Sequence, residues 1–453
     1  MSDQSLRHGL KVRHLTMMGL GSAIGAGLFV GSGNAIQSAG PAVLVSYIVA
    51  GVVVVIIMSL LGELASARPS SGAFSTYAEQ GIGRWAGYAV GWAYWFMLIM
   101  VLGVEILAAT TIMAGWINIP QWLIAGVLIA LFAAVNLVGV RQFGELEFWF
   151  AAIKVAAIIG FLVVGVLIVT GVISAGPNVG VGQLVAGDGG FAPRGAAGVA
   201  AGLLAVMFAF GGIEIITIAA AEATNPQSAI RRATISIMWR ILFFYIGSVV
   251  VMLAVVPWND PQFEQGGFVA VLNRANIPYA SGLMEAVIVV ALLSAFNAQL
   301  YATSRMAFSL AQRGEGPAVL LRLSGRDVPW IAVMVSIVFS VLAVTAHALD
   351  TQGRVMGTLL DAVGAFLLII WVFIAVSQIR LRPQLEREGS LKMRTWAHPW
   401  LAIGALVSIT AFIVLMLFDA NGRQNLSFAL VMFAMICGTY VIHSRRGAQR
   451  SLQ

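Results

Sequence analysis

Long apolar stretches separated by short polar segments follow one another along the whole sequence. Twelve of them approach or exceed the length of about 20 residues with which an α-helix crosses a bilayer core of about 30 Å. We expect these helices at about 15–39, 41–67, 85–115, 119–139, 148–173, 197–222, 236–256, 280–306, 329–349, 356–381, 397–417 and 424–443. The pattern therefore predicts an all-α integral membrane protein.

Composition points to the same class of protein. Of the 453 residues, 60% are hydrophobic and 10% are charged, whereas soluble proteins carry about 25% charged residues to cover a surface that faces water. No segment between the apolar stretches is long enough to fold as a separate soluble domain. We expect a single transmembrane domain at 15–443, preceded by a cytoplasmic segment at 1–14 and followed by a cytoplasmic tail at 444–453.

The net charge of +7 is unevenly divided between the two sides of the expected bundle. If the N-terminus is cytoplasmic, 21 Lys and Arg residues lie inside, Lys154 lies in a span, and four lie outside: Arg194, Arg274, Arg354 and Arg423. Positive charge gathers on the cytoplasmic side of membrane proteins, so we expect both termini in the cytoplasm. The partner implied by this basicity is the lipid bilayer, not a nucleic acid.

The sequence contains no pattern typical of an enzyme or a metal site. Cys437 is the single cysteine, and the five histidines are scattered without zinc-ligand spacing. The glycine-rich segment 174–196 lacks the lysine of a phosphate-binding loop. The first apolar stretch is too long for a cleavable signal peptide. We expect no enzymatic activity, no metal and no cofactor.

Two of the expected spans are interrupted by small residues, at Gly19–Gly33 and at Phe208–Ala223. Glycine inside a helix costs about 1 kcal/mol, so this clustering has a cause. One explanation is close helix packing through small residues, and the other is a discontinuous helix that lines a midplane binding site. Because the interruptions open two five-helix blocks, 15–173 and 197–381, we favour an inverted-repeat transporter with broken helices 1 and 6 and two extra helices at 397–443.

The motifs at these positions resemble the amino acid–polyamine–organocation superfamily, in its bacterial amino acid transporter branch. They include IGAGLFVGSG at 24–33, FGELEFWFAAIKV at 143–155, FAFGGIE at 208–214 and AAAEATNP at 219–226. The resemblance covers nearly the whole chain. It implies a five-plus-five inverted repeat of the LeuT type and uptake of an amino acid, driven by a proton gradient, across a bacterial cytoplasmic membrane.

The interrupted spans also suggest how an amino acid binds. Unwound amides bind its carboxylate, and unwound carbonyls accept from its ammonium. The expected substrate-binding residues from both breaks and the surrounding spans are Ala23, Ile24, Gly25, Ala26, Gly27, Phe208, Phe210, Gly211, Gly212, Glu105 and Asn297.

Buried ionisable residues suggest how transport is driven, because a charge at the bilayer centre is costly. Lys154 matches a fifth-helix lysine that, in the resembling permeases, takes the place of sodium, and Glu105 is the alternative proton carrier. We expect Glu214, Glu222 and Phe210 to act in gating, although each carboxylate also suits a structural pair.

Two motifs of the sequence resemble permeases for different substrates. SQIRLRPQLE at 377–386 is similar to γ-aminobutyrate permeases, whereas GGIE at 211–214 is closer to proline and aromatic amino-acid permeases. γ-Aminobutyrate or a neutral amino acid is the expected substrate. A sensor that binds an amino acid without transporting it is the alternative to a permease.

Overall fold

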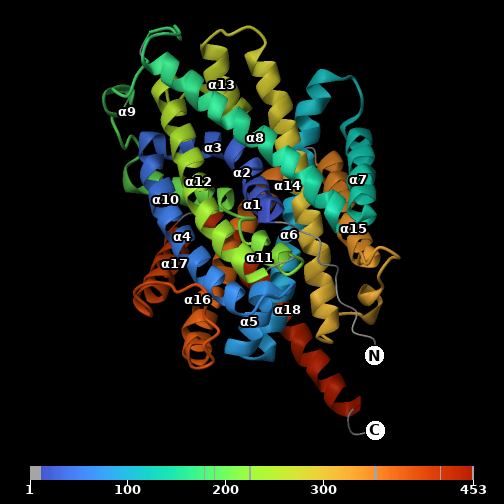
Figure 1. Cartoon of the computed structure of the whole chain (residues 1–453). Coiled ribbons are helices and arrows are strands. Elements are labelled where there is room, and N and C mark those ends of the chain that lie inside the picture. Colours follow the sequence, from blue (N-terminus) through green and yellow to red (C-terminus); the bar gives the residue numbers. More distant parts are fainter. Residues whose placement is uncertain are drawn as a thin grey trace.

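A computed structural model describes residues 12–177, 179–187, 189–223, 226–350, 355–418 and 420–450. These residues form one helical bundle without β-strands (Figure 1). Its elements are α1 (Val12–Ala23), α2 (Ala26–Phe29), α3 (Gly31–Ala39), η1 (Gly40–Ala42), α4 (Val43–Ala67), α5 (Ala73–Gly81), α6 (Arg84–Trp116), α7 (Gln121–Val138), α8 (Val140–Val169), α9 (Gln183–Ala186), α10 (Gly195–Ala209), α11 (Ile215–Ala220), α12 (Pro226–Val255), η2 (Pro261–Gln265), α13 (Gly267–Arg274), α14 (Ala280–Gln312), η3 (Ala318–Leu321), α15 (Trp330–Leu349), α16 (Val355–Arg387), α17 (Trp400–Phe418) and α18 (Ala420–Arg450).

Nine helical segments of the described residues are long and apolar enough to cross a membrane. The prediction of a helical, multi-pass membrane protein is thereby confirmed. Two shorter apolar helices, Gly195–Met207 and Leu242–Val255, fall in the expected sixth and seventh spans. The expected first span is divided among α1, α2 and α3. The first and sixth spans, in which glycines predicted an interruption, are therefore among those that do not form one continuous membrane-crossing helix.

Several helices continue beyond the apolar stretches that predicted them. α8 begins at residue 140 instead of 148, α12 at 226 instead of 236, and α18 continues to 450 through most of the expected tail. Backbone hydrogen bonds extend a helix one residue at a time, whether or not the added residue is apolar. Hydropathy alone therefore placed these ends too close to the membrane centre.

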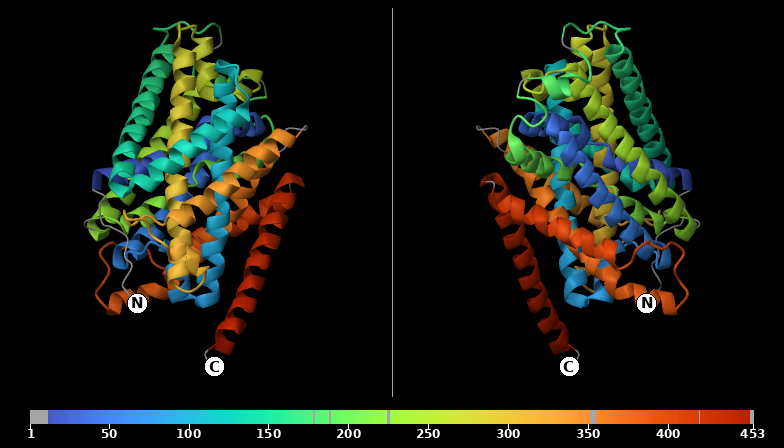
Figure 2. Two further views of the ribbon diagram at one scale, coloured as in Figure 1. Left: turned by 90° about the vertical axis from the view of Figure 1, so that its right-hand side faces the viewer. Right: turned by 90° about the vertical axis from the view of Figure 1, so that its left-hand side faces the viewer.

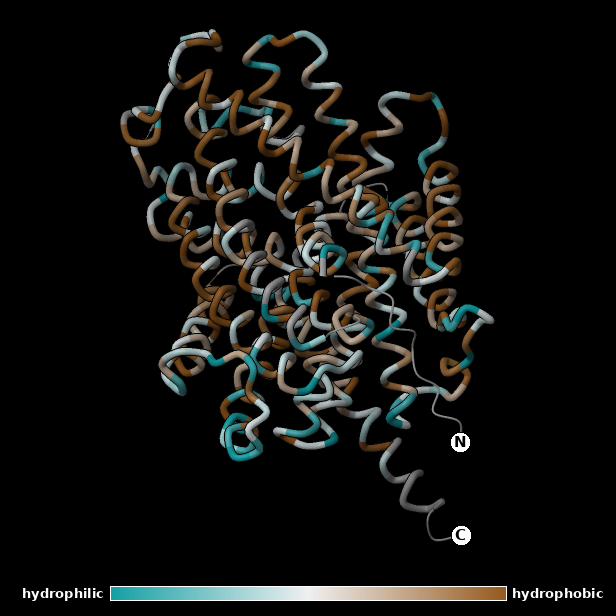
Figure 3. Tube along the Cα trace, in the orientation of Figure 1, coloured by the Kyte–Doolittle hydropathy of each residue, from teal (hydrophilic) through white to brown (hydrophobic). Residues whose placement is uncertain are grey.

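The broken helices occupy the middle of the bundle. α1 packs against α8, α12 and α14, and α3 lies along α10. Figure 1 shows α1, α2 and α11 surrounded by longer helices. α6 packs against α14 and α16, whereas α18 runs along the outside of the bundle (Figure 2). Hydrophobic residues cover most of the long helices, and hydrophilic ones gather in connecting segments at the lower edge (Figure 3).

Candidate functional site

The first expected span is interrupted near its middle. α1 ends at Ala23, α2 begins at Ala26, and Gly25 between them has an extended backbone with φ −138° and ψ −144°. Gly27 follows in α2, where a Cβ atom would collide with the backbone of Ala209 in α10. The absence of a side chain at Gly27 therefore allows the two broken helices to touch, a role beyond the substrate approach expected from the sequence.

The second interruption separates α10 from α11. Gly212 lies there at φ +95°, a conformation that residues with a Cβ atom rarely adopt. A Cβ at this position would also come within 2.7 Å of the carbonyl oxygen of Ser22. The Ser22 hydroxyl donates a hydrogen bond of 2.9 Å to the Gly212 carbonyl. The backbone of the break thus requires glycine here, and a further role of Gly212 in setting pocket size stays a prediction.

Tyr245 of α12 joins the two interruptions. Its hydroxyl lies 2.7 Å from the carbonyl oxygens of both Ala23 and Ala209. Its ring stacks on Phe210, with centroids 5.1 Å apart, and Tyr47 of α4 meets the Phe210 ring edge-on. The Phe210 side chain is therefore packed among aromatic rings of α4 and α12. The expected role of Phe210 in substrate binding and gating stays a prediction.

The Lys154 ammonium binds the break in the first span. Lys154 is completely buried in α8, and its Nζ donates to the carbonyl oxygens of Gly21 at 2.5 Å and Ile24 at 3.0 Å. Carbonyl oxygens released by an interrupted helix are the kind of ligand that a metal cation would otherwise take. The side chain thereby fastens α8 to α1.

Glu105 of α6 occupies the amide end of the same break. The backbone N–H of Ala26 lies 3.2 Å from both carboxylate oxygens of Glu105, whose side chain is 3% exposed. This amide is one of those expected to bind a substrate carboxylate. In this conformation, therefore, a carboxylate of the protein is bound there.

Sequence reasoning missed Glu147, because its helix was expected to begin at 148. Glu147 is completely buried in α8 and accepts hydrogen bonds from the Ser294 hydroxyl at 2.6 Å and from the Asn297 amide at 3.2 Å. The Asn297 oxygen accepts a further bond from Asn136 at 2.9 Å. The polar atoms of Asn297, expected in the pocket wall, are thus directed to these partners. The signal in the sequence was the seven-residue spacing from Glu147 to Lys154, which places both on one helix face.

A cavity of about 10 Å³ lies between the two interruptions. This volume suits about one water molecule, so the site is contracted in this conformation. Phe208, another expected site residue, has a side chain that lies outside the described residues. The cavity is lined by Ser22, Ala23, Gly27, Met97, Val101, Glu105, Gly211, Gly212, Gln299 and Val363.

A buried ion pair follows the second interruption. Glu222, just after α11, accepts from Arg305 Nε at 3.0 Å and from the Tyr301 hydroxyl at 2.7 Å, both on α14. The Tyr301 ring stacks on Phe143 of α8 with centroids 4.4 Å apart. Glu214, the other carboxylate expected in gating, is buried, and neither oxygen has a hydrogen-bond partner among the described residues.

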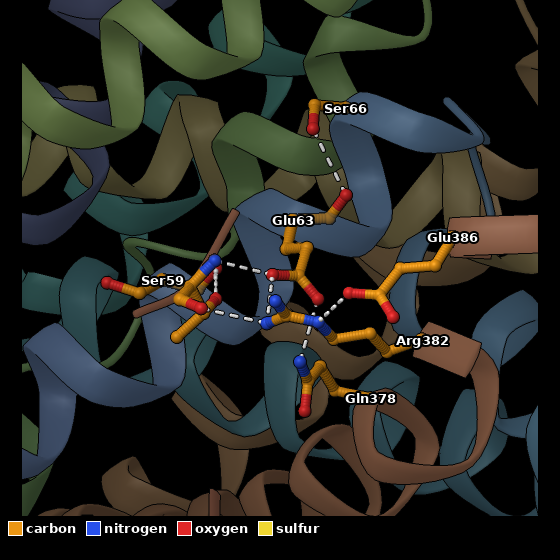
Figure 4. A network of polar contacts seen from close by, with 7 residues as sticks. Ser59, Glu63, Ser66, Gln378, Arg382 and Glu386 are labelled. Carbon is orange, nitrogen blue, oxygen red and sulfur yellow. Dashed lines mark hydrogen bonds and ion pairs between the residues drawn. The ribbon is translucent and has the colours of Figure 1, made fainter. Parts of the chain in front are cut away.

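A second buried network ties α4 to α16 (Figure 4). The Glu63 carboxylate accepts from Gln378 at 2.7 Å and from Arg382 at 3.1 Å, and Thr395 donates its backbone N–H to it. Arg382 also donates to Glu386 at 3.0 Å. Removing one member of such a network leaves buried polar groups without partners, so these contacts hold the segment before α17 against α4.

Larger cavities lie toward the expected outside loops. One of about 350 Å³ and one of about 500 Å³ share Asn34 and Ser38 of α3. Arg194 and Trp258, from those loops, line the larger one. The open volume and the buried ion pair of Glu222 are therefore on opposite sides of the small central cavity.

Comparison with known proteins places nearly the whole chain in one family. The model of the family described as Amino acid permease matches residues 14–447. The aromatic amino acid transport protein AroP of Corynebacterium glutamicum is 48% identical over 96% of this chain and 95% of its own length. The γ-aminobutyric acid permease of Escherichia coli is 42% identical over 95% and 92%, and that of Bacillus subtilis is 39% identical over 98% and 95%.

Proposed function

Because this chain belongs to the amino acid permease family, we propose that it imports an amino acid together with protons across a bacterial cytoplasmic membrane. The family and the relatives above are transporters, not enzymes. We propose the proton as the driving ion, and below we propose the substrate and the roles of individual residues. The observation that carries the proposal is the buried Lys154 ammonium on the carbonyls of the first break.

The proposed architecture has twelve transmembrane helices within a single domain at 15–443. Two inverted five-helix repeats, 15–173 and 197–381, are followed by extra helices at 397–443. The matching interruptions in the first and sixth spans, joined by Tyr245, support this repeat. The charge distribution supports a cytoplasmic segment at 1–14 and a cytoplasmic tail at 444–453.

Substrate binding at the breaks begins with a competition between two carboxylates. The substrate carboxylate and Glu105 both suit the backbone N–H of Ala26. A proton on Glu105 weakens it as an acceptor and leaves the amide to the substrate. Ala23 and Gly211 line the cavity, and backbone carbonyls of this lining are the proposed acceptors for the substrate ammonium. Proton and substrate consequently favour the same state, which is the requirement for symport.

Lys154 completes the proposed coupling. While protonated, it holds α8 to the carbonyls of Gly21 and Ile24, as a bound sodium ion would. Loss of its proton weakens both contacts and frees α1 to move relative to α8. Because α1 continues through the break to the substrate site, protonation of Lys154 biases the equilibrium between the two access states. Glu222 with Arg305 and, after the second break, Glu214 are the proposed gating groups on the inner side.

The walls of the cavity favour a neutral side chain. Met97, Val101 and Val363 are apolar, and Glu105 is the one carboxylate in the lining. γ-Aminobutyrate is one candidate, and aromatic amino acids or proline are the other. The relatives include both an aromatic amino acid transport protein and γ-aminobutyric acid permeases, which supports the first candidate and the aromatic one alike. A competition panel of unlabelled amino acids against labelled uptake separates them.

Uptake into proteoliposomes tests the proposal. We expect accumulation of labelled amino acid under a proton gradient alone and no stimulation by a sodium gradient alone. Lys154→Ala abolishes accumulation and leaves measurable substrate binding, whereas Lys392→Ala, the same change in an exposed loop, leaves accumulation intact. Sodium-dependent accumulation contradicts proton coupling. Binding without uptake under either gradient favours the sensor.

A further inference from the structure

Glu147 is a buried carboxylate to which the transport scheme above gives no task. It lies on α8 two turns before Lys154, and it contacts α14 through Ser294 and Asn297. Lys154 on the same face contacts α1. We propose that Glu147 binds the transported proton, with Ser294 as the hydroxyl partner that suits both its charged and its neutral form. This inference rests on the proposed proton-coupled transport and adds a residue to it.

The two hydrogen-bond partners of Glu147, Asn297 and Ser294, differ in whether they can accept a hydrogen bond from it. Asn136 donates one N–H to the Phe132 carbonyl at 2.9 Å and another to the Asn297 oxygen at 2.9 Å. With its oxygen held in this way, Asn297 turns its NH₂ group to Glu147, and an NH₂ group only donates. Oε2 of Glu147 is therefore confined to accepting, and an added proton has no partner on that side.

The Ser294 hydroxyl contacts Oε1, the other carboxylate oxygen of Glu147, and can either donate or accept a hydrogen bond. A hydroxyl group donates one hydrogen bond and accepts others. When Glu147 is ionised, Ser294 donates to Oε1 across 2.6 Å. When Oε1 carries a proton, rotation of the hydroxyl lets Ser294 accept from it at the same distance. Glu147 can therefore gain or lose a proton and keep its hydrogen bond to Ser294 in both forms.

The charged side chains around Glu147 carry one more negative than positive charge when all are ionised. Lys154 interacts electrostatically with both Glu147 and Glu105, so two carboxylates share one buried cation. Among the side chains that the structure describes on the other elements packed against α8, α7 presents Asn136, α12 presents the Tyr245 hydroxyl, and Arg305 of α14 is paired with Glu222. On α1, Arg13 and His14 pair with Glu145, which is 39% exposed. One proton, on Glu147 or on Glu105, makes the group of these two carboxylates and Lys154 neutral, and neutrality lowers the cost of burial.

Glu147→Gln separates proton movement from substrate movement. Glutamine keeps the shape and both hydrogen bonds of the neutral acid but cannot release a proton. We expect exchange of labelled for unlabelled substrate, which needs no net proton flow, to stay within about threefold of the native rate. A pH gradient of one unit sustains about a tenfold substrate gradient when one proton accompanies each substrate. We expect that tenfold accumulation to be lost.

Two further variants make the result decisive. Glu147→Asp restores an ionisable group and should regain part of the accumulation, with a shifted pH profile. Glu145→Gln, the same substitution two residues earlier on the exposed face, should accumulate normally. The inference is wrong if Glu147→Gln accumulates substrate as well as the native protein at every pH. It is also wrong if Glu147→Gln and Glu147→Asp both lose exchange as strongly as accumulation while their substrate affinity is unchanged. Failure of the native protein to accumulate under a proton gradient contradicts the proposed function instead.

Discussion

Arg305 on α14 donates its Nε–H to the carboxylate of Glu222 across 3.0 Å, and the two side chains are only 2% and 3% exposed. The pair joins the end of the broken sixth span to a long, continuous helix. Removing one partner from a buried ion pair costs about 3–5 kcal/mol, because the remaining charge stays buried without a counter-charge. If the proposed gating role of Glu222 holds, opening of the inner side separates these two residues.

Neutralising one partner should open the inner side. Thr217 on α11 is buried in the structure, and Cys437 is the single cysteine, so Thr217→Cys in a Cys437→Ser background reports access. We expect Glu222→Gln to speed maleimide labelling at least about tenfold, since about 1.4 kcal/mol corresponds to tenfold. Glu388→Gln, which breaks the exposed pair with Arg68, is the control. Equal labelling rates in the two variants would show that the ion pair does not hold the gate.

Gly27 should tolerate no side chain. A Cβ atom there would collide with the α carbon of Ala209 in α10, and an overpacked helix contact costs about 1–3 kcal/mol. Gly27→Ala should lower the midpoint of thermal unfolding in detergent and weaken substrate binding at the same time. Gly126→Ala on α7 adds its methyl group to open space and should leave both unchanged. Native stability with reduced affinity at Gly27→Ala would assign the glycine to substrate approach alone.

Gln299 should distinguish substrates by their polar groups. Its side chain is 2% exposed and lines the central cavity, and its Oε1 has no hydrogen-bond partner among the described residues. A substrate donor that reaches this oxygen gains about 0.5–1.5 kcal/mol. Gln299→Leu should therefore weaken competition by tyrosine or γ-aminobutyrate about two- to tenfold relative to phenylalanine. Equal changes for all three competitors would place Gln299 in packing only.

Glu315, between α14 and η3, should make stability depend on pH. Burial raises the pKa of its carboxyl from 4.5 to about 7, Arg313 opposes the rise, and Glu79 adds to it. The folded state then binds more protons than the unfolded state between these values, so the free energy of unfolding falls as pH rises from about 4.5 to about 7 and levels off above. Thermal unfolding in detergent at pH 5 and 8 measures this. Glu315→Gln should reduce the difference, and an unchanged difference would assign it to other groups.

Part of the site could be foreseen from local signals. Glycine clusters marked the two interruptions, and the improbability of a lysine in an apolar span drew attention to Lys154. In the structure its ammonium lies at the carbonyl oxygen of Gly21, within the first interruption. Glu147 was overlooked because hydropathy placed the start of the fifth span one residue after it, at 148, whereas the helix begins at Val140.

The sequence by itself determined the membrane setting, the positions of most helices, the two breaks and the family, because each depends on composition or on motifs that are local in the chain. Tertiary structure decided what each polar group in the breaks faces. Glu105 meets Ala26 across 79 positions, Phe210 packs on Tyr245, and Asn297 binds Glu147 across 150 positions. A buried donor or acceptor takes the partner that packing brings within about 3 Å. Between helices so far apart in the chain, that choice follows from how the helices cross and not from any local pattern.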